Sequence, residues 1–99
     1  MDELKLFEVE TWFDNEEWSV AFIVLKGINK VTLNKRSTTT YEVISGQGIF
    51  HTTDKVTPVE AGSTITILSE TFYYDEGDLV MCATSVPAFR QEDVEVLDS

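Results

Sequence analysis

The fold of this chain is decided by residues 41–68, which read YEVISGQGIFHTTDKVTPVEAGSTITIL. Apolar and polar residues alternate there in two runs, and the segment between Thr52 and Lys55 has the composition of a turn. Glycines stand where we expect sharp corners, at Gly46, Gly48 and Gly62. A period of two is typical of strands with one covered face, and neither run has a helical period. The stretch therefore predicts consecutive antiparallel strands.

Further short strands are predicted on both sides of this stretch. Residues 18–26 are so apolar that both faces of a strand there must be covered, which favours a sandwich or barrel over an open sheet. Residues 28–33 and 79–84 predict two more strands, residues 75–78 a turn, and residues 94–97 a short last strand or an edge. Roughly seven to nine short strands without a long helical window predict an all-β domain.

The length of 99 residues fits one small domain. We take residues 1–17, which are acidic and partly alternating, as an N-terminal strand or arm, and about 18–89 as the core. No apolar run approaches the roughly 20 residues of a spanning helix, and the start Met1-Asp2-Glu3 lacks the basic region of a secretory signal. These features predict a cytoplasmic protein that does not contact a membrane.

The formal net charge of −11 disfavours nucleic acid as a partner, because duplex binding needs a cationic face. The acidic excess has two explanations, solubility or an anionic surface that docks on a basic protein. Four of the seven cations lie within eleven residues, namely Lys26, Lys30, Lys35 and Arg36. Either they offset nearby carboxylates or they form an anion site.

Reactive side chains are scarce. Cys82 is the one cysteine and lies in an apolar run, which predicts a buried structural thiol. His51 is the one histidine, so a histidine-based metal site or a Ser-His-Asp triad within one chain has to use it. Its neighbours in the sequence supply no carboxylate or thiol at a known catalytic spacing.

The order of these features resembles the small single-domain cupins over roughly residues 20–89. The likeness is carried by an apolar strand and a polar segment, followed by Tyr41-x-Val43-Ile44-x-Gly46-x-Gly48, Ala61-Gly62-Ser63, Ile65-x-Ile67, the aromatic cluster Phe72-Tyr73-Tyr74, Gly77-Asp78 and Pro87-x-Phe89. The resemblance implies a jelly-roll β-barrel, also called a double-stranded β-helix, whose mouth and interior hold the site.

The resemblance also implies positions for a metal site, and this chain lacks the ligands there. When the closing glycine of the first family motif is placed on Gly46 and the second motif is counted from Gly62, the four ligand positions fall on Leu33 or Thr32, Lys35 or Asn34, Thr39, and Tyr73 or Phe72. These side chains are poor substitutes for the imidazoles and carboxylate that hold iron, manganese or zinc. We therefore predict no metal and no cofactor.

The residues favour binding over catalysis, although whether the chain is an enzyme stays open. The first hypothesis is a non-catalytic module for a small anionic or sugar-like molecule. The cations, hydroxyls and aromatic rings expected at the barrel mouth suit such a ligand, and they belong to Lys35, Arg36, Thr39, Tyr41 and Tyr73.

Two alternatives remain. Metal-free cupins include sugar isomerases and epimerases, and for that activity His51 or Tyr73 would be the acid or base. A third hypothesis is an acidic interaction domain that docks through residues 1–17 on a basic protein. Cupin-like domains commonly pair through their sheets, so we also predict a homodimer, with its seam at Trp12, Phe13 and Trp18.

Overall fold

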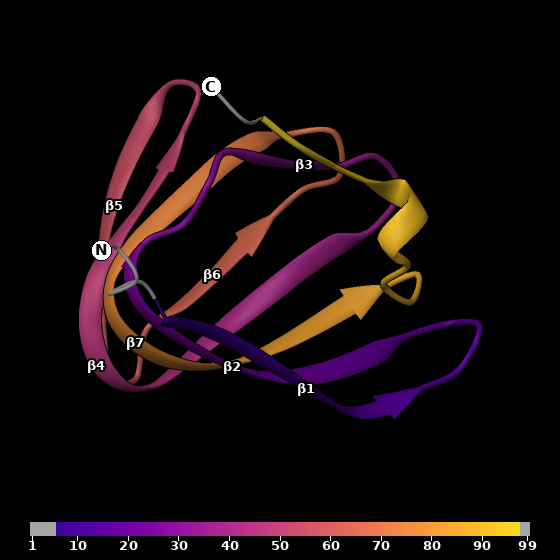
Figure 1. Cartoon of the computed structure of the whole chain (residues 1–99), viewed down its shortest axis with the longest axis horizontal. Helices are drawn as coiled ribbons and strands as arrows, with labels where there is room; N and C mark the ends of the chain where they lie inside the picture. The colour runs from indigo at the N-terminus through magenta and orange to yellow at the C-terminus, as the bar shows by residue number, and fades with distance from the viewer. Residues whose placement is uncertain (1–5, 98–99) are drawn as a thin grey trace.

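The computed structural model describes residues 6–97, with side chains from residue 14 onward. This part of the chain forms antiparallel strands that curl into a barrel (Figure 1). The elements are β1 (Leu6–Asp14), β2 (Ser19–Ile28), β3 (Thr32–Asn34), β4 (Thr38–Thr52), β5 (Lys55–Glu60), β6 (Thr64–Ile67), β7 (Phe72–Val86), the short 3-10 helix η2 (Gln91–Asp93) and β8 (Val94–Val96). The turn predicted between Thr52 and Lys55 is confirmed, because these two residues pair across the β4–β5 hairpin.

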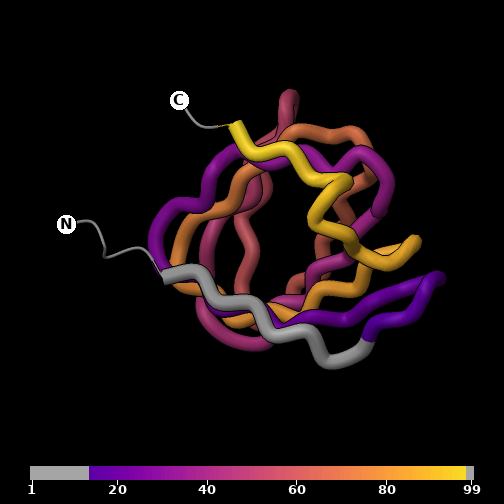
Figure 2. The backbone as a smooth tube through the Cα atoms, turned by 45° about the vertical axis from the view of Figure 1, so that its right-hand side comes forward, coloured from indigo at the N-terminus to yellow at the C-terminus, as the bar shows by residue number. Residues whose placement is uncertain are grey.

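Strand β7 is the centre of the sheet. It pairs with β2 along one side and with β4 along the other, and its first residues also pair with β3. Strands β5 and β6 both pair with β4, while β1 and β8 extend the sheet from β2 and β3. Because β4 and β7 are 15 residues each and bend strongly, the tube in Figure 2 closes into a ring.

The inner face of the barrel changes in side-chain size along its length. Inward residues of β7 become smaller from Leu79 through Met81 and Ala83 to Ser85. Their partners on β2 become smaller in step, because the register pairs them with Leu25, Ile23, Ala21 and Ser19. Large apolar side chains, with Phe50 of β4 among them, fill one end of the barrel. Small side chains leave the other end hollow.

Two details of β7 differ from the sequence prediction. The turn predicted over residues 75–78 is wrong, because β7 runs through it without a break. Asp75 is only 2% exposed and accepts a hydrogen bond from the Asn29 side chain at 3.1 Å, so its carboxylate is satisfied inside the fold. Cys82 is partly buried rather than fully buried, since it alternates with the inward residues on either side of it.

The glycines of residues 41–68 serve two purposes. Gly62 lies in the turn between β5 and β6, as predicted. Gly46 and Gly48 lie within β4 and not at corners, and there they let β4 pass close to the backbone of β7. The same stretch therefore predicted strands correctly but misplaced two of its bends.

The N-terminal segment forms an edge of the sheet. Strand β1 pairs with β2 along its whole length and has no second neighbour among the described strands. Residues 1–5 and the side chains of Trp12 and Phe13 lie outside what the structure describes, and Trp18 is 38% exposed. The homodimer seam and the docking of residues 1–17 on a basic partner stay predictions. Residues 6–97 contain no helix that is long and apolar enough to cross a membrane.

Candidate functional site

A cavity of about 420 Å³ occupies the hollow end of the barrel. Its walls come from the inner faces of β2, β4 and β7, from β6, from β3 with the loop before it, and from the chain that follows β7. Most of the sheet residues that line it are small or carry a hydroxyl, including Ser19, Ala21, Thr39, Tyr41, Ala83 and Ser85. The cavity thus combines apolar walls with mainly neutral hydrogen-bonding groups, which is the usual character of a small-molecule site, and Asp14 and Lys30 are the charged residues of its lining.

Two tyrosines stand together in this cavity. The hydroxyls of Tyr41 on β4 and Tyr73 on β7 lie 2.6 Å apart and share a hydrogen bond. Phe50, which is fully buried, supports both rings, with centroid distances of 5.1 Å to Tyr41 and 6.3 Å to Tyr73. One hydroxyl proton is used within the pair, so the other proton is available to a bound molecule.

The environment keeps both tyrosines neutral. Burial raises the pKa of Tyr41 well above its usual value, and the neighbouring Tyr73 and the charge of Asp75 raise it further. Burial also raises the pKa of Tyr73 to about 12. The hydrogen bond with Tyr41 lowers this pKa, and the charge of Asp75 raises it. Near pH 7 the pair therefore donates hydrogen bonds and does not act as a base.

The raised pKa of Tyr73 predicts a loss of stability in alkali. An unfolded tyrosine releases its proton near pH 10, whereas Tyr73 in the folded protein keeps it until about pH 12. Between these values the unfolded state binds fewer protons, so the free energy of unfolding falls by up to about 1.4 kcal/mol per pH unit for this group. Below pH 10 the contribution of Tyr73 to the free energy of unfolding is constant.

Urea unfolding at several pH values measures this effect. The free energy of unfolding should decline less steeply with alkaline pH in Tyr73→Phe than in the wild type, and an equal slope would contradict the raised pKa of Tyr73.

Three of the five residues predicted to bind a ligand meet at the cavity. Tyr41 and Tyr73 form the pair described above, and Thr39 lines the same cavity. The Thr39 hydroxyl shares a hydrogen bond of 2.8 Å with the Ser85 hydroxyl, and both residues are buried. Thr39 and Tyr41 face the same side because they are two residues apart on one strand.

The structure places the other two predicted ligand residues elsewhere. Lys35 Nζ lies 3.7 Å from a carboxylate oxygen of Glu95, and Arg36 Nη1 lies 3.6 Å from Asp93 Oδ2. Both cationic side chains are about half exposed, and neither lines the cavity. This arrangement agrees with the interpretation that the cations offset nearby carboxylates. Lys30 does line the cavity.

His51 also lies away from the cavity lining. Its Nε2 atom is 2.6 Å from Glu76 Oε2, and its ring stacks on that of Tyr74 with centroids 4.2 Å apart. Because β4 alternates, this position does not bring His51 next to Tyr73, the other acid or base considered from the sequence. The two candidates are therefore not part of one catalytic pair.

Several lining residues were missed from the sequence. They include Ser19, Ala21, Ala83 and Ser85 on β2 and β7, and Phe89, Gln91, Val94 and Val96 in the chain after β7. The first group leaves a signal, because small residues repeat at every second position of two apolar strands. The second group leaves none, since its place depends on contacts between residues far apart in the chain.

Solved structures share this arrangement of strands. The protein Pac13 from Streptomyces, in a variant bound to uridine, superposes with a TM-score of 0.83 at 24% identity, over 99% of this chain and 88% of that chain. The chain has a cupin fold. An RmlC-like cupin from Desulfovibrio desulfuricans gives a TM-score of 0.73 at 20% identity over 84% of each chain. Ectoine synthase from P. lautus gives 0.78 at 12% identity, over 100% of this chain and 80% of that chain.

These identities establish the fold alone. The predicted jelly-roll barrel is confirmed by neighbours that include a protein with a double-stranded β-helix domain from Klebsiella pneumoniae. No protein-family model and no curated protein sequence matches this chain. What the site does has to be argued from its own residues.

The cavity does not fit the metal site of the cupin fold. Of the residues placed at the family's ligand positions, four line the cavity, and all of them carry neutral side chains, namely Thr32, Asn34, Thr39 and Tyr73. Among residues 14–97, where side chains are described, no three His, Cys, Asp or Glu side chains gather closely enough to hold a metal ion. Neutral hydroxyls are weak ligands for transition metals, so we derive no step through a metal here.

Proposed function

We propose that the protein binds a small, uncharged, hydroxyl-bearing molecule of the sugar or nucleoside type inside the barrel. The observation that carries this proposal is the Tyr41–Tyr73 hydroxyl pair facing a cavity with small and hydroxylated walls. Of the sugar-like and anionic ligands expected from the sequence, the geometry favours the sugar-like one. Lys35 and Arg36 lie outside the cavity, and the carboxylate of Asp75 stands near the tyrosines.

The chemistry of such ligands matches the walls. A sugar presents hydroxyls at its rim and apolar C–H groups on its faces, so it needs both hydrogen-bond donors and flat apolar surface. The tyrosines, Thr39 and Ser85 supply hydroxyls, while Ile23 and Ile67 supply apolar wall. The volume of about 420 Å³ lies within the usual range for small-molecule sites. A fold neighbour binds uridine in its own structure, which supports nucleosides as the first compounds to test.

Isothermal titration with uridine, neutral sugars and their phosphates tests the proposal. Replacing Tyr73 by phenylalanine removes one hydrogen-bonding group, so we expect about tenfold weaker binding of the neutral compound that binds best. Tyr74→Phe is the matched control, because Tyr74 stacks on His51 away from the cavity lining, and it should bind like the wild type.

The outcomes separate the ligand classes. Absence of binding by every neutral compound, or equal affinity of Tyr73→Phe and the wild type, would contradict the proposal. Binding of phosphates alone, lost in Lys35→Ala with Arg36→Ala, would indicate the anion site instead.

Catalysis at the same cavity is the second candidate. Fold neighbours include a protein described as a nucleoside dehydratase and an ectoine synthase. Tyr73 is neutral near pH 7 and could protonate a leaving oxygen as a general acid. Isomerases, epimerases and dehydratases that abstract a proton from carbon share one signature, deuterium uptake into the ligand in heavy water. NMR of the bound compounds in heavy water would detect it, and a ligand that binds without exchange or turnover favours the binding module.

A further inference from the structure

We propose that residues 87–96, here called the strap, form a releasable wall of the cavity, and that the ion pairs of Arg90, Asp93 and Glu95 control access to the interior. The strap follows β7, passes through η2 and ends with β8 beside β3 (Figure 1). Four of its side chains line the cavity, those of Phe89, Gln91, Val94 and Val96. This inference extends the proposed function, because the strap would control exchange of the bound molecule.

The strap is joined to the barrel by few backbone bonds. Residues 87–93 belong to no strand, and β8 pairs only with the three residues of β3. A backbone hydrogen bond from the Lys35 N–H to the Asp93 carbonyl, at 2.9 Å, joins residues 87–93 to the turn after β3. Segments with few ladder bonds open more easily than the sheet they lie against.

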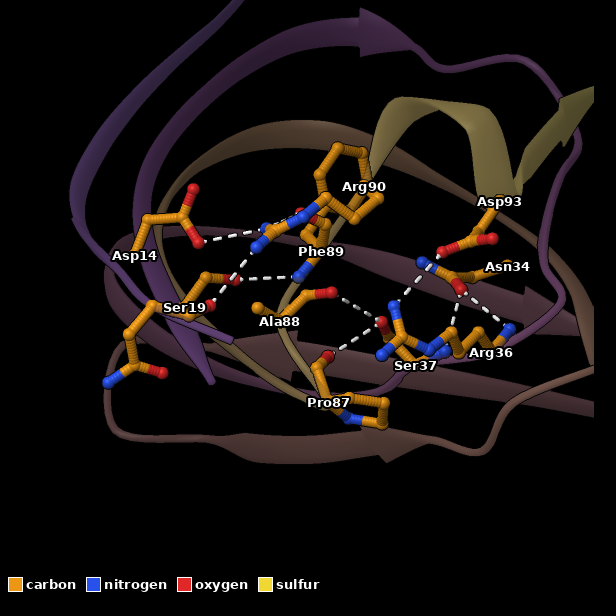
Figure 3. Close-up of polar contacts among 11 residues, drawn as sticks. Asp14, Ser19, Asn34, Arg36, Ser37, Pro87, Ala88, Phe89, Arg90 and Asp93 are labelled. Atoms are coloured by element: carbon orange, nitrogen blue, oxygen red, sulfur yellow. Dashed lines mark hydrogen bonds and ion pairs between the residues drawn. The ribbon is translucent and has the colours of Figure 1, made fainter. Parts of the chain in front are cut away.

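Two buried serines fix the position of the strap. The Ser37 hydroxyl donates to the Pro87 carbonyl at 2.7 Å, and the Ser19 hydroxyl accepts from the Phe89 N–H at 2.9 Å (Figure 3). Both serines are 5% exposed or less. These hydrogen bonds are neutral and partly buried, so salt affects them little and they define where the strap lies when it is closed.

Charged contacts hold the strap at both sides of the opening. Arg90 Nη1 lies 2.9 Å from Asp14 Oδ1 on the β1–β2 hairpin, and the same guanidinium donates to the Asn15 carbonyl at 3.2 Å. On the opposite side, Arg36 pairs with Asp93, as Figure 3 shows, and Lys35 pairs with Glu95. All three pairs are partly exposed, so salt weakens them.

One of these contacts is incomplete. Asp93 Oδ2 is buried without a hydrogen bond among the described residues, and Arg36 approaches it only to 3.6 Å. A carboxylate oxygen held by charge alone, without a hydrogen bond, is a weak anchor. The Arg36–Asp93 side is therefore where we expect the strap to detach first.

Access to the cavity can be measured without a ligand. The reporter is Ala83→Cys in a Cys82→Ser background, since Ala83 is buried on the cavity wall and its neighbour faces outward. The uncharged reagent 4,4′-dithiodipyridine labels the introduced thiol, and its rate reports opening. We expect slow labelling at low salt and several-fold faster labelling at about 1 M NaCl, where the Debye length is only about 3 Å.

Removing one anchor should have the same effect. Arg90→Gln deletes the pair with Asp14, and we expect it to raise the labelling rate about fivefold at low salt and to reduce the salt dependence. Lys55→Gln is the matched control, because it removes the same charge from the β4–β5 hairpin and should leave the rate unchanged.

A labelling rate that changes neither with salt nor in the Arg90→Gln variant would overturn the inference. So would an equal acceleration of the native Cys82 thiol in the wild-type protein, because that would report general loosening and not release of the strap. The salt comparison needs only the reporter variant, so it stands even if Arg90→Gln does not fold. The labelling experiment uses no ligand. If the strap is releasable but the protein binds no neutral compound, only the proposed function is contradicted and the inference about the strap stands.

Discussion

Gly46→Ala is expected to destabilise the protein by about 3–5 kcal/mol, whereas Gly62→Ala should cost only about 1–2 kcal/mol. The two glycines have nearly the same backbone conformation, with φ of +89° and +95°. They differ in their surroundings, because a Cβ on Gly46 would overlap the backbone carbonyl of Asp78 while one on Gly62 would meet open space. The pair of variants thus separates the cost of a positive φ from the cost of steric overlap.

Urea unfolding of the two variants and the wild type measures this difference. Gly46 lies next to the irregularity between Val43 and Ser45, where β4 bends across β7, and backbone atoms there cannot move aside as a side chain can. Similar midpoints for the two variants would mean that the β4–β7 crossing tolerates a methyl group. The tight approach would then not be required for closing the barrel.

The barrel could be predicted from local pattern because its strands alternate. The stretch around Tyr41 showed the period of two. Through the cupin resemblance, the spacing from Gly46 placed Thr39 at the site and the spacing from Gly62 placed Tyr73 there. Both residues do line the cavity. The same pattern failed at Asp75, because a sequence of acids and glycine has turn composition whether or not its carboxylate finds a buried partner.

The partners of the charged side chains and the position of the C-terminal segment could not be predicted from the sequence. The cluster containing Lys35 and Arg36 was visible, but nothing local shows that its partners are Asp93 and Glu95. The Ser37 hydroxyl that holds the strap bonds to a carbonyl 50 residues away. Contacts of this kind depend on how the barrel closes, so they follow from the tertiary structure and leave no periodic signal.

The hollow end of the barrel could have been predicted from the sequence by pairing the small residues of two strands. Small residues repeat at alternate positions near the start of β2 and the end of β7, and antiparallel pairing brings them opposite one another, Ala21 to Ala83 and Ser19 to Ser85. A barrel whose inward residues become small at the same level on adjacent strands leaves volume there. This pairing, and not any reactive residue, is what makes the end of the barrel a candidate site.

Filling that volume gives the prediction with the largest effect on binding. Ala21→Leu adds three carbon atoms to the wall of the cavity, so we expect the affinity for the best neutral ligand to fall by about 100-fold, or roughly 2.7 kcal/mol. Stability should stay level or rise by about 1 kcal/mol, because the added carbons fill apolar space. The matched control is Val20→Leu, on the same strand but facing outward, which should change neither quantity strongly.

Affinity and thermal unfolding of both variants have to be measured together. A destabilised Ala21→Leu would lose binding for a trivial reason, whereas a stable variant without binding locates the ligand inside the barrel. If Ala21→Leu binds like the wild type, the ligand lies elsewhere and the hydroxyl pair of Tyr41 and Tyr73 serves packing alone. The paired small residues would then be a feature of barrel closure and not of recognition.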